Sequence, residues 1–467
     1  MAYRFLHLSD IHFGQSSGTA AKHDHIRKAL LADAKSLAQQ RGSPTRILIT
    51  GDISYSGKQD EFKTAIHWIE QLTAACGCHE THVCSIPGNH DCDRTAITNQ
   101  ARMVYAQLRA HNSSEMVQAS LVEINQDGEP ANPFLPKLSA YRQFASAYGC
   151  DFGSPSCPSW QHEFDFPSGV KLRLHGLTSV QVSNAEDALG NMILGNQQYM
   201  ISEEDDVINV VLVHHPLHWF EDREEAEKFL HNNARIIMVG HEHVVNIHKT
   251  EDQFSHKEWV VIHAGASNPP EGAYGHSYNW IELSHEERDG SHHLVVEVFP
   301  RAWNSDSVRF ERDHRKLGAT GDSVKIDIAC PNIKLGMAQK EQPVEPMGVP
   351  AVPFAAENTP LAPKPVTANP LTTTHEVSPM KVDSTAFDRL RYLFWHYLDW
   401  QQRLKVLVDV DALPKTANQP VPQTLERVAL ESAAKSTGKL HDLWEAMMPL
   451  IPENKRASNP FQRNDRL

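Results

Sequence analysis

The stretch FLHLSDIH, at residues 5–12 of this 467-residue chain, is a short, mostly apolar run that ends in a polar cluster. The same order of apolar run and polar cluster recurs in ILITGD at 47–52 and in VCSIPGNHD at 83–91. Between these stretches, apolar residues recur at helical spacing over 26–37 and 62–72. Short apolar runs that alternate with helical patterns predict a βαβαβ unit.

Polar clusters follow these three predicted strands and also two later ones. The later blocks are VLVHHP at 211–216 and MVGHEH at 238–243. Because the carboxyl ends of neighbouring parallel strands open on one crevice, we expect the clusters to meet there. Alternate residues of an extended chain point to the same side, so Asp10 with His12 can direct two ligands into the crevice. His241 and His243 have the same spacing.

Carboxylate, imidazole and amide oxygen together form a metal-binding set. These donors suit Mn²⁺, Fe²⁺/Fe³⁺ or Zn²⁺ better than Ca²⁺. Each block is weak evidence by itself, because a Gly-Asp pair arises by chance and neighbouring histidines are often core or surface side chains. Five such blocks, each after an apolar run, favour a shared metal site over unrelated histidines.

The middle of the chain, residues 93–200, is less regular, and we interpret it as an insertion that roofs the site. It contains helical patterns near 96–111 and 135–148 and a predicted hairpin at 160–177. Strand-like runs then follow at 207–213, 235–239, 259–263, 280–283 and 294–299. The last of these lack intervening helices, which predicts a second, more antiparallel sheet. The expected fold class is α/β, with two sheets packed face to face and flanked by helices.

Composition changes sharply after residue 335. Residues 336–383 are rich in proline, alanine and threonine, which is typical of an extended linker. Apolar residues at helical spacing return beyond it and predict a small all-helical domain over 384–467. The expected organisation is a catalytic domain at 1–335, a linker and a helical adaptor or oligomerisation domain.

Composition also restricts the class of protein. Hydrophobic residues make up 40% and charged residues 22%, which is ordinary for a globular protein, and no apolar run approaches the ~20 residues of a membrane span. The N-terminus lacks the features of a secretory signal, so we expect a cytoplasmic location. A net charge of −14 argues against broad attraction to nucleic acid but not against a nucleotide, because bound divalent cations offset it locally.

The seven cysteines are odd in number and scattered, which favours reduced thiols over a disulfide framework. Cys76 and Cys78 with Cys84 suggest a zinc knuckle, but their spacing is wrong for the common zinc ribbons.

With all five blocks in order, the sequence resembles the calcineurin-like metallophosphoesterase superfamily, whose pattern is D-x-H, G-D, G-N-H-D/E, H and G-H-x-H. The resemblance covers roughly residues 3–305 and implies a four-layer αββα sandwich with a binuclear metal site. The implied ligands of one metal are Asp10, His12 and His243, those of the other are Asn89, His214 and His241, and Asp52 bridges the two.

The resemblance also implies roles for residues that bind no metal. His90 contacts the phosphoryl group or the leaving oxygen, and Asp91 orients His90; the alternative for His90 is a structural histidine. His215 competes with His214 as a ligand, and we prefer His214 because it stands two residues before the proline. The expected mechanism is in-line attack by a hydroxide that bridges the metals.

Neighbouring residues receive more modest interpretations. His7 and His263 are expected to be buried structural side chains. Tyr55, Ser56 and Arg94 follow the ligand blocks and are candidate phosphate contacts.

The string GDISYSG at 51–57 with GNHD at 88–91 is most similar to the cyclic-nucleotide phosphodiesterase branch, although the nuclease branch shares the ligands. This resemblance implies a phosphodiester substrate, either a nucleotide or a nucleic acid. The helices at 384–467 resemble effector-associated adaptor domains of bacterial conflict systems, which implies a protein partner; self-association is the alternative. Two further interpretations stay open: a nuclease effector of a defence system, and a metal-binding scaffold that acts through the helical domain.

Overall fold

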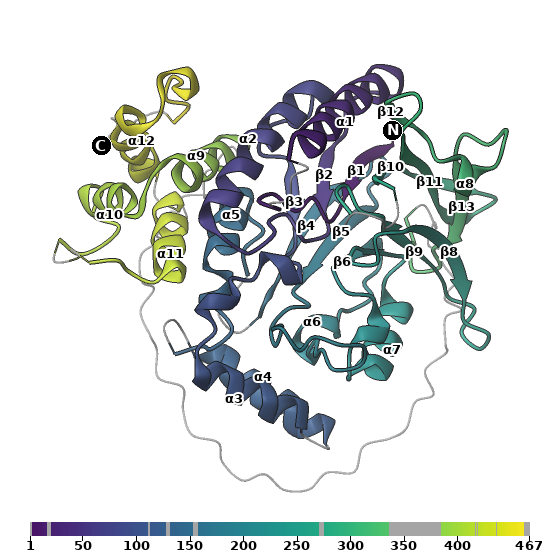
Figure 1. Cartoon of the computed structure of the whole chain (residues 1–467), viewed down its shortest axis with the longest axis horizontal. Coiled ribbons are helices and arrows are strands. Elements are labelled where there is room, and N and C mark those ends of the chain that lie inside the picture. The colour runs from purple at the N-terminus through teal and green to yellow at the C-terminus, as the bar shows by residue number, and fades with distance from the viewer. Residues whose placement is uncertain are drawn as a thin grey trace, which may run out of the picture.

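The computed structural model describes residues 2–15, 20–110, 113–127, 131–152, 157–269, 275–335, 384–415, 417, 419–435 and 437–461. Two β-sheets pack face to face between layers of helices (Figure 1). The first sheet begins with parallel strands β1 (Tyr3–Leu8), β2 (Arg46–Ile49) and β3 (Val83–Ser85). β10 (Ser277–Arg288) pairs antiparallel with β1, and β11 (Ser291–Asn304), β12 (Arg309–Arg312) and β13 (Val324–Ala329) extend the sheet.

The second sheet has the strand order β4-β5-β6-β7-β9-β8. Its strands are β4 (Ser159–Asp165), β5 (Lys171–Leu177), β6 (Val207–Val213), β7 (Ile236–Val239), β8 (Val245–Glu251) and β9 (Glu258–Ala264). The four central strands are parallel, and only β4 and β8 at the edges run antiparallel.

The structure corrects the expected strand assignment. The late antiparallel runs at 280–283 and 294–299 belong to β10 and β11, which complete the first sheet rather than the second. The predicted hairpin at 160–177 is confirmed as β4 and β5, but β5 pairs with β6. Part of the segment interpreted as an insertion therefore belongs to the sandwich, because strand pairing between distant segments leaves no local signal in the sequence.

Alternation along β6 shows how the layers form. Val210 and Leu212 are buried between the two sheets, whereas Val211 and Val213 are buried against α7 (Arg223–Asn233). Successive side chains of a strand point to opposite faces, so a strand covered on both faces is mostly apolar. The exception in β6 is Asn209, whose side chain donates to the carbonyls of Ser202 and Asn233. Every residue of β6 is buried. The predicted four-layer αββα sandwich is the observed one.

Helices cover the outer faces and the ends of the sandwich. The helices that precede the second sheet in the chain are α1 (Ala20–Arg41), α2 (Gln59–Cys76), α3 (Asn99–Ala110), α4 (Ser114–Gln126) and α5 (Ser139–Tyr148). The short helices α6 (Asn196–Tyr199) and α8 (His314–Leu317) lie between strands. α3 and α4 project from the body of the molecule (Figure 1). The predicted linker at 336–383 lies outside the described residues.

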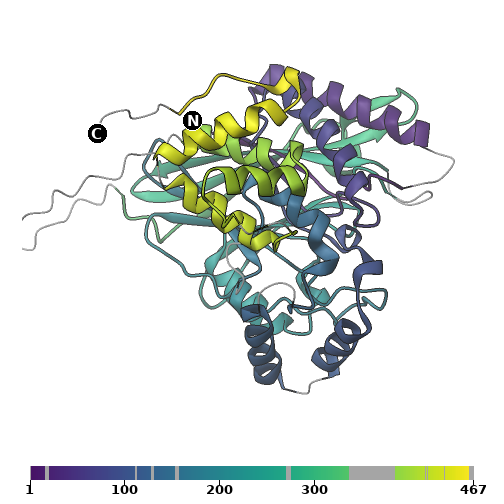
Figure 2. The same cartoon turned by 90° about the vertical axis from the view of Figure 1, so that its left-hand side faces the viewer.

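Four helices form the C-terminal module that the sequence predicts, and they pack against the sandwich (Figure 2). They are α9 (Ser384–Tyr397), α10 (Trp400–Asp409), α11 (Gln423–Ala434) and α12 (Thr437–Met447). α9 lies along α5, where the ring of Tyr392 is 5.8 Å from that of Tyr148. Apolar residues of the module and of the sandwich form one continuous core.

A single carboxylate of α2 anchors this module. Oε1 of Glu70 accepts hydrogen bonds from Tyr392 Oη and Lys455 Nζ, each at 2.7 Å, and from the hydroxyl of Tyr397. Burial raises the pKa of Glu70, but the hydrogen bonds from Lys455 and the two tyrosines outweigh burial and hold the pKa below its ordinary value. The ionised carboxylate is therefore the form that stabilises the contact.

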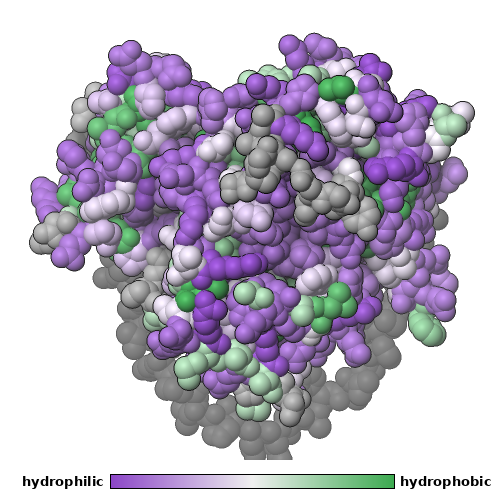
Figure 3. All heavy atoms as spheres, viewed as in Figure 1, coloured by the Kyte–Doolittle hydropathy of each residue, from purple (hydrophilic) through white to green (hydrophobic). Residues whose placement is uncertain are grey.

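The surface is mostly hydrophilic in the view of Figure 3, with small separate apolar groups. Among the described residues, no helix has both the length and the apolar character that a bilayer span requires. The cytoplasmic location expected from the sequence stays a prediction.

We expect Glu70→Gln to lower the free energy of unfolding by roughly 1–3 kcal/mol, because charge-assisted hydrogen bonds from three donors are weakened. The folded pKa lies below the ordinary value of 4.5, so this stabilisation is present above pH 4.5 and is lost as the pH falls through the folded pKa. Thermal unfolding of wild type and variant at neutral and acidic pH measures both effects. Asp60→Asn on the exposed side of α2 is the control, and an equal loss in both variants would contradict the anchoring role.

Candidate functional site

All five polar blocks lie at the carboxyl ends of strands, where the edges of the two sheets meet. Those of the first sheet follow β1, β2 and β3, and those of the second sheet follow β6 and β7. The structure brings together the residues that the sequence singled out: Asp10, His12, Asp52, Asn89, His90, His214, His241 and His243. Their contacts join segments more than 200 residues apart in the chain.

The backbone of the site adopts an uncommon conformation. Asp10, His12, Asp52, His241 and His243 all have φ between 51° and 64°, the left-handed region that non-glycine residues rarely occupy. They are five of the ten such residues in the described part of the chain. Strain of this kind persists where function requires it and the surrounding structure holds it in place.

Glycines make room for the candidate ligands. A Cβ on Gly88 would lie 2.1 Å from Oδ1 of Asp52, and a Cβ on Gly51 would lie 2.5 Å from Nδ1 of His214. Gly51 also has φ of 93°. The glycine before a ligand is therefore required because another ligand occupies the space that its side chain would fill.

Two buried carboxylates form the middle of the site. Oδ1 of Asp10 lies 3.0 Å from Nε2 of His243, and its Oδ2 accepts a hydrogen bond from the His241 N–H at 3.2 Å. Oδ2 of Asp52 lies 3.3 Å from Nε2 of His12 and 3.5 Å from Nε2 of His214. Neither aspartate is more than 1% exposed.

The buried carboxylates of the site carry negative charge, which shifts the pKa values of the groups around them. Burial raises the pKa of Asp52, but His214 and His12 outweigh burial and hold that pKa well below its usual range. Burial lowers the pKa of His214, yet the charge of Asp52 outweighs burial and raises it to about 9. Two carboxylates that draw protons onto their neighbours in this way also attract cations.

The donor atoms form overlapping groups rather than one cluster. Four groups at this site have donors within 4.8 Å of one another: Asp10 with His12 and His243, His12 with Asp52 and His90, Asp10 with Asp52 and His214, and His214 with His215 and His241. Oδ1 of Asn89 lies 3.2 Å from Nε2 of His214 and adds an amide donor on that side. The carboxylates thus stand between two sets of imidazoles, an arrangement that fits two cations.

A family model for the calcineurin-like phosphoesterases matches residues 3–245, which is more than half of the chain. The chain belongs to this family. Residues 386–449 match the model of the GTPase-associated adaptor domain. Members of the phosphoesterase family bind divalent metals and act on phosphate esters, and the donor groups described above are suited to such ions.

Solved structures with a similar fold have low sequence identity. Vps29 of Entamoeba histolytica complexed with Zn²⁺ is 11% identical, with 70% of this chain and 98% of that chain covered and a TM-score of 0.28. NAD nucleotidase of Haemophilus influenzae is 11% identical, with 68% and 55% covered and a TM-score of 0.30. The 5′-nucleotidase precursor of Thermus thermophilus is 10% identical, with 70% and 54% covered and a TM-score of 0.32. The chain spans about half the length of these two nucleotidases, and no curated protein matches it.

The histidine pair of this phosphoesterase contributes both of its rings to the site. His214 is oriented by a 2.7 Å hydrogen bond between its Nδ1 and the carbonyl of Thr50, which leaves Nε2 facing Asp52 and Asn89. His215 is oriented by Ser179, whose Oγ is 2.8 Å from Nδ1, and its buried Nε2 has no hydrogen-bond partner among the described residues. The contacts of His214 favour it as the ligand, and His215 supplies a further nitrogen beside His241.

Two residues of the GNHD block take separate positions. Nδ1 of His90 is 2.8 Å from the carbonyl of Tyr55, and the two rings stack with centroids 5.1 Å apart. Burial lowers the pKa of His90, although the charge of Asp52 partly offsets this. The carboxylate of Asp91 accepts from Gly88 N at 2.9 Å and from both N and Oγ of Ser54 at 2.8 and 3.0 Å. Asp91 therefore fixes the backbone of the loop that carries His90. It influences the orientation of the His90 ring through that backbone.

The remaining sequence candidates lie in other environments. Oγ of Ser56 donates to Glu61 at the start of α2, and Arg94 is exposed. His7 and His263 are buried, as expected. Sequence reasoning missed the main-chain carbonyls of Asn268 and Thr50, which orient His12 and His214. Backbone acceptors can be supplied by any residue type, so no sequence signal could have found them.

We expect Asp91→Ala to lower the free energy of unfolding by roughly 2–4 kcal/mol, because it leaves the buried N–H groups of Ser54 and Gly88 without an acceptor, while the Ser54 hydroxyl keeps the carbonyl of His90. Thermal unfolding measures the effect, and Asp60→Ala, at an exposed carboxylate of α2, is the control. If both variants unfold at the same temperature as wild type, Asp91 does not support the loop.

Proposed function

We propose that the protein is a binuclear metal-dependent phosphodiesterase that hydrolyses nucleotide or nucleic-acid diesters. The observation that supports it most is the gathering of the candidate ligands around two buried carboxylates, with His90 beside them. One ion would be held by Asp10, His12 and His243, the other by Asn89, His214 and His241, with Asp52 shared between them. Mn²⁺, Fe²⁺/Fe³⁺ or Zn²⁺ suits this donor set.

Two bound divalent ions supply Lewis acidity and lower the pKa of water. The residues of the chain contribute positioning and proton transfer. The His90 N–H donates to Oδ1 of Asp52 at 2.8 Å and so ties the GNHD loop to the shared carboxylate. Nδ1–H of His90 donates to the carbonyl of Tyr55, so Nε2 of the neutral ring carries no proton. The protonated imidazolium is therefore the form whose Nε2 would donate a proton to the leaving oxygen.

The preference for a diester follows from the similarity of GDISYSG at 51–57 and GNHD at 88–91 to the phosphodiesterase branch. The net charge of the chain favours a nucleotide diester over a nucleic-acid diester. A net charge of −14 argues against broad attraction to long nucleic acids, so a small nucleotide diester is the favoured substrate and a nuclease is the alternative.

Hydrolysis of bis-p-nitrophenyl phosphate with Mn²⁺ tests the activity. We expect His90→Ala to retain bound Mn²⁺ and to lower kcat by roughly 10²–10⁴-fold for a cyclic mononucleotide, whose leaving sugar oxygen needs a proton, but far less for bis-p-nitrophenyl phosphate, whose nitrophenolate leaves without one. Asp52→Asn is expected to lose both metal and activity. His256→Ala, at an exposed hairpin histidine, is the control. Equal rates in all four proteins would refute the enzymatic proposal.

A substrate series then distinguishes the cyclic-nucleotide phosphodiesterase branch from the nuclease branch. We expect cyclic mononucleotides or cyclic dinucleotides to be cleaved faster than single-stranded DNA or RNA, and bis-p-nitrophenyl phosphate faster than p-nitrophenyl phosphate. Product formation under Mn²⁺ for wild type and His90→Ala measures the preference. Faster cleavage of the nucleic acids would favour the nuclease alternative, and faster cleavage of the monoester would contradict the diesterase.

We also propose that the C-terminal module recruits a protein partner, a GTPase or a protein associated with one. The match of residues 386–449 to the GTPase-associated adaptor domain supports this proposal. Trp400, Leu425 and Val428 of α10 and α11 are 40–49% exposed and offer apolar contacts.

Full-length protein with all three of these residues changed to serine tests the recruitment. We expect it to lose a GTPase that co-purifies with wild type, while sedimentation and phosphodiesterase activity stay unchanged. The matched control is Val308→Ser, at an exposed apolar residue of the sandwich. If self-association disappears instead, the module is an oligomerisation domain.

A further inference from the structure

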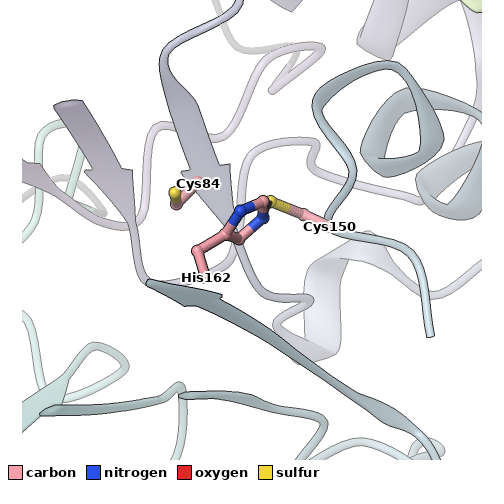
Figure 4. A group of neighbouring side chains, drawn as sticks. All are labelled: Cys84, Cys150 and His162. Atoms are coloured by element: carbon pink, nitrogen blue, oxygen red, sulfur yellow. Dashed lines mark hydrogen bonds between the residues drawn. The ribbon is translucent and has the colours of Figure 1, made fainter. Parts of the chain in front are cut away.

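A second group of metal-binding side chains lies outside the binuclear site (Figure 4). It contains Cys84 of β3, Cys150 just after α5 and His162 of β4. The sequence had suggested grouping Cys84 with Cys76 and Cys78. The structure instead places Cys84 beside two residues that are more than 60 positions away in the chain.

The distance between two of these donors is that of a tetrahedral metal site. All three donor atoms lie within 4.8 Å of one another, and Sγ of Cys150 is 3.7 Å from Nε2 of His162. In a tetrahedral zinc site, Zn–S and Zn–N bonds of about 2.3 and 2.05 Å place sulfur and nitrogen about 3.6 Å apart. Cys150 and His162 therefore need little movement to bind one ion.

We propose that Cys84, Cys150 and His162 bind a Zn²⁺ ion, with water in the fourth position, and that this ion is separate from the binuclear pair. Two thiolates and one imidazole form a soft donor set that selects Zn²⁺ over Mg²⁺, Ca²⁺ or Mn²⁺. Nε2 of His162 lies 3.2 Å from the carbonyl of Gly149 and so carries the ring proton when no metal is bound. Binding would release the two thiol protons and move the ring proton from Nε2 to Nδ1, so the imidazole stays neutral. The product is electrically neutral.

The surroundings act differently on the two thiols. Both cysteines are buried, with exposed fractions of 0 and 1%. The hydrogen bond from Cys150 outweighs burial and lowers the pKa of Cys84, whereas burial raises the pKa of Cys150 well above its ordinary value, so the bound ion would have to displace that proton. Burial also lowers the pKa of His162, to about 3, so this imidazole is neutral at physiological pH and available to a metal.

The position of the ion predicts a structural role. It would join β3 of the first sheet to β4 of the second, where Nε1 of Trp160 already donates to the carbonyl of Ser85 at 2.8 Å. Arg391 of α9 packs on Gly149, where a Cβ would lie 2.8 Å from its Cζ. The ion would therefore stabilise the sandwich next to the contact with the C-terminal module.

Cobalt substitution of the full-length, reduced protein tests the site. A thiolate that binds Co²⁺ gives an intense near-ultraviolet charge-transfer band, and the proposed ligands of the binuclear site include no thiolate. We expect the band in wild type and in Asp52→Asn, and its loss in Cys84→Ser and Cys150→Ser. Zinc content should fall by one equivalent per chain in the same two cysteine variants.

Cys330→Ser is the matched control, because Cys330 is equally buried and lies outside the group. It should keep both the band and the zinc. Absence of the band in wild type with all seven thiols titratable would overturn the proposal, as would a disulfide between Cys84 and Cys150 in protein isolated under reducing conditions. A band that persists in both cysteine variants would also overturn it. None of these readouts depends on phosphodiesterase activity.

Discussion

Two carboxylates, Asp10 and Asp52, are buried side by side, and much of the structure serves to make this arrangement stable. An isolated buried carboxylate is costly, so each must be matched by positive charge and by hydrogen-bond donors. His12, His214 and His243 provide the contacts, and the main-chain N–H groups of His90 and His241 supply further hydrogen bonds. Divalent cations would complete the compensation, as expected for a member of a family that binds divalent metals.

The same constraint explains the unusual backbone of the site. Short loops after parallel strands must turn two ligands inward within a few residues, and the left-handed conformation of Asp10, His12, Asp52, His241 and His243 achieves this. The energy of these strained turns is offset by the two sheets on which they rest, since the strands that lead into them are almost entirely buried.

Helix α2 connects the site to the C-terminal module. It begins just after the Asp52 loop, where Glu61 accepts hydrogen bonds from Ser56 and Lys58, and farther along it carries Glu70, which anchors the module. Removal of the C-terminal module would therefore uncover α2 and α5 as well as delete the proposed partner-binding element. Point substitutions at the exposed face of the module separate these two effects.

The sequence alone determined the five strand-end blocks, the βαβαβ start, the two-sheet class and the helical C-terminal module. Hydrophobic periodicity and ligand spacing are local properties of a chain, so they can be recognised without coordinates. Only the tertiary structure showed that the late antiparallel strands complete the first sheet, that Thr50 and Asn268 orient two histidines through their carbonyls, and that Cys84 meets Cys150 and His162. These features depend on contacts between distant segments, and such contacts are decided by how the sheets pack and not by the order of residues within any one segment.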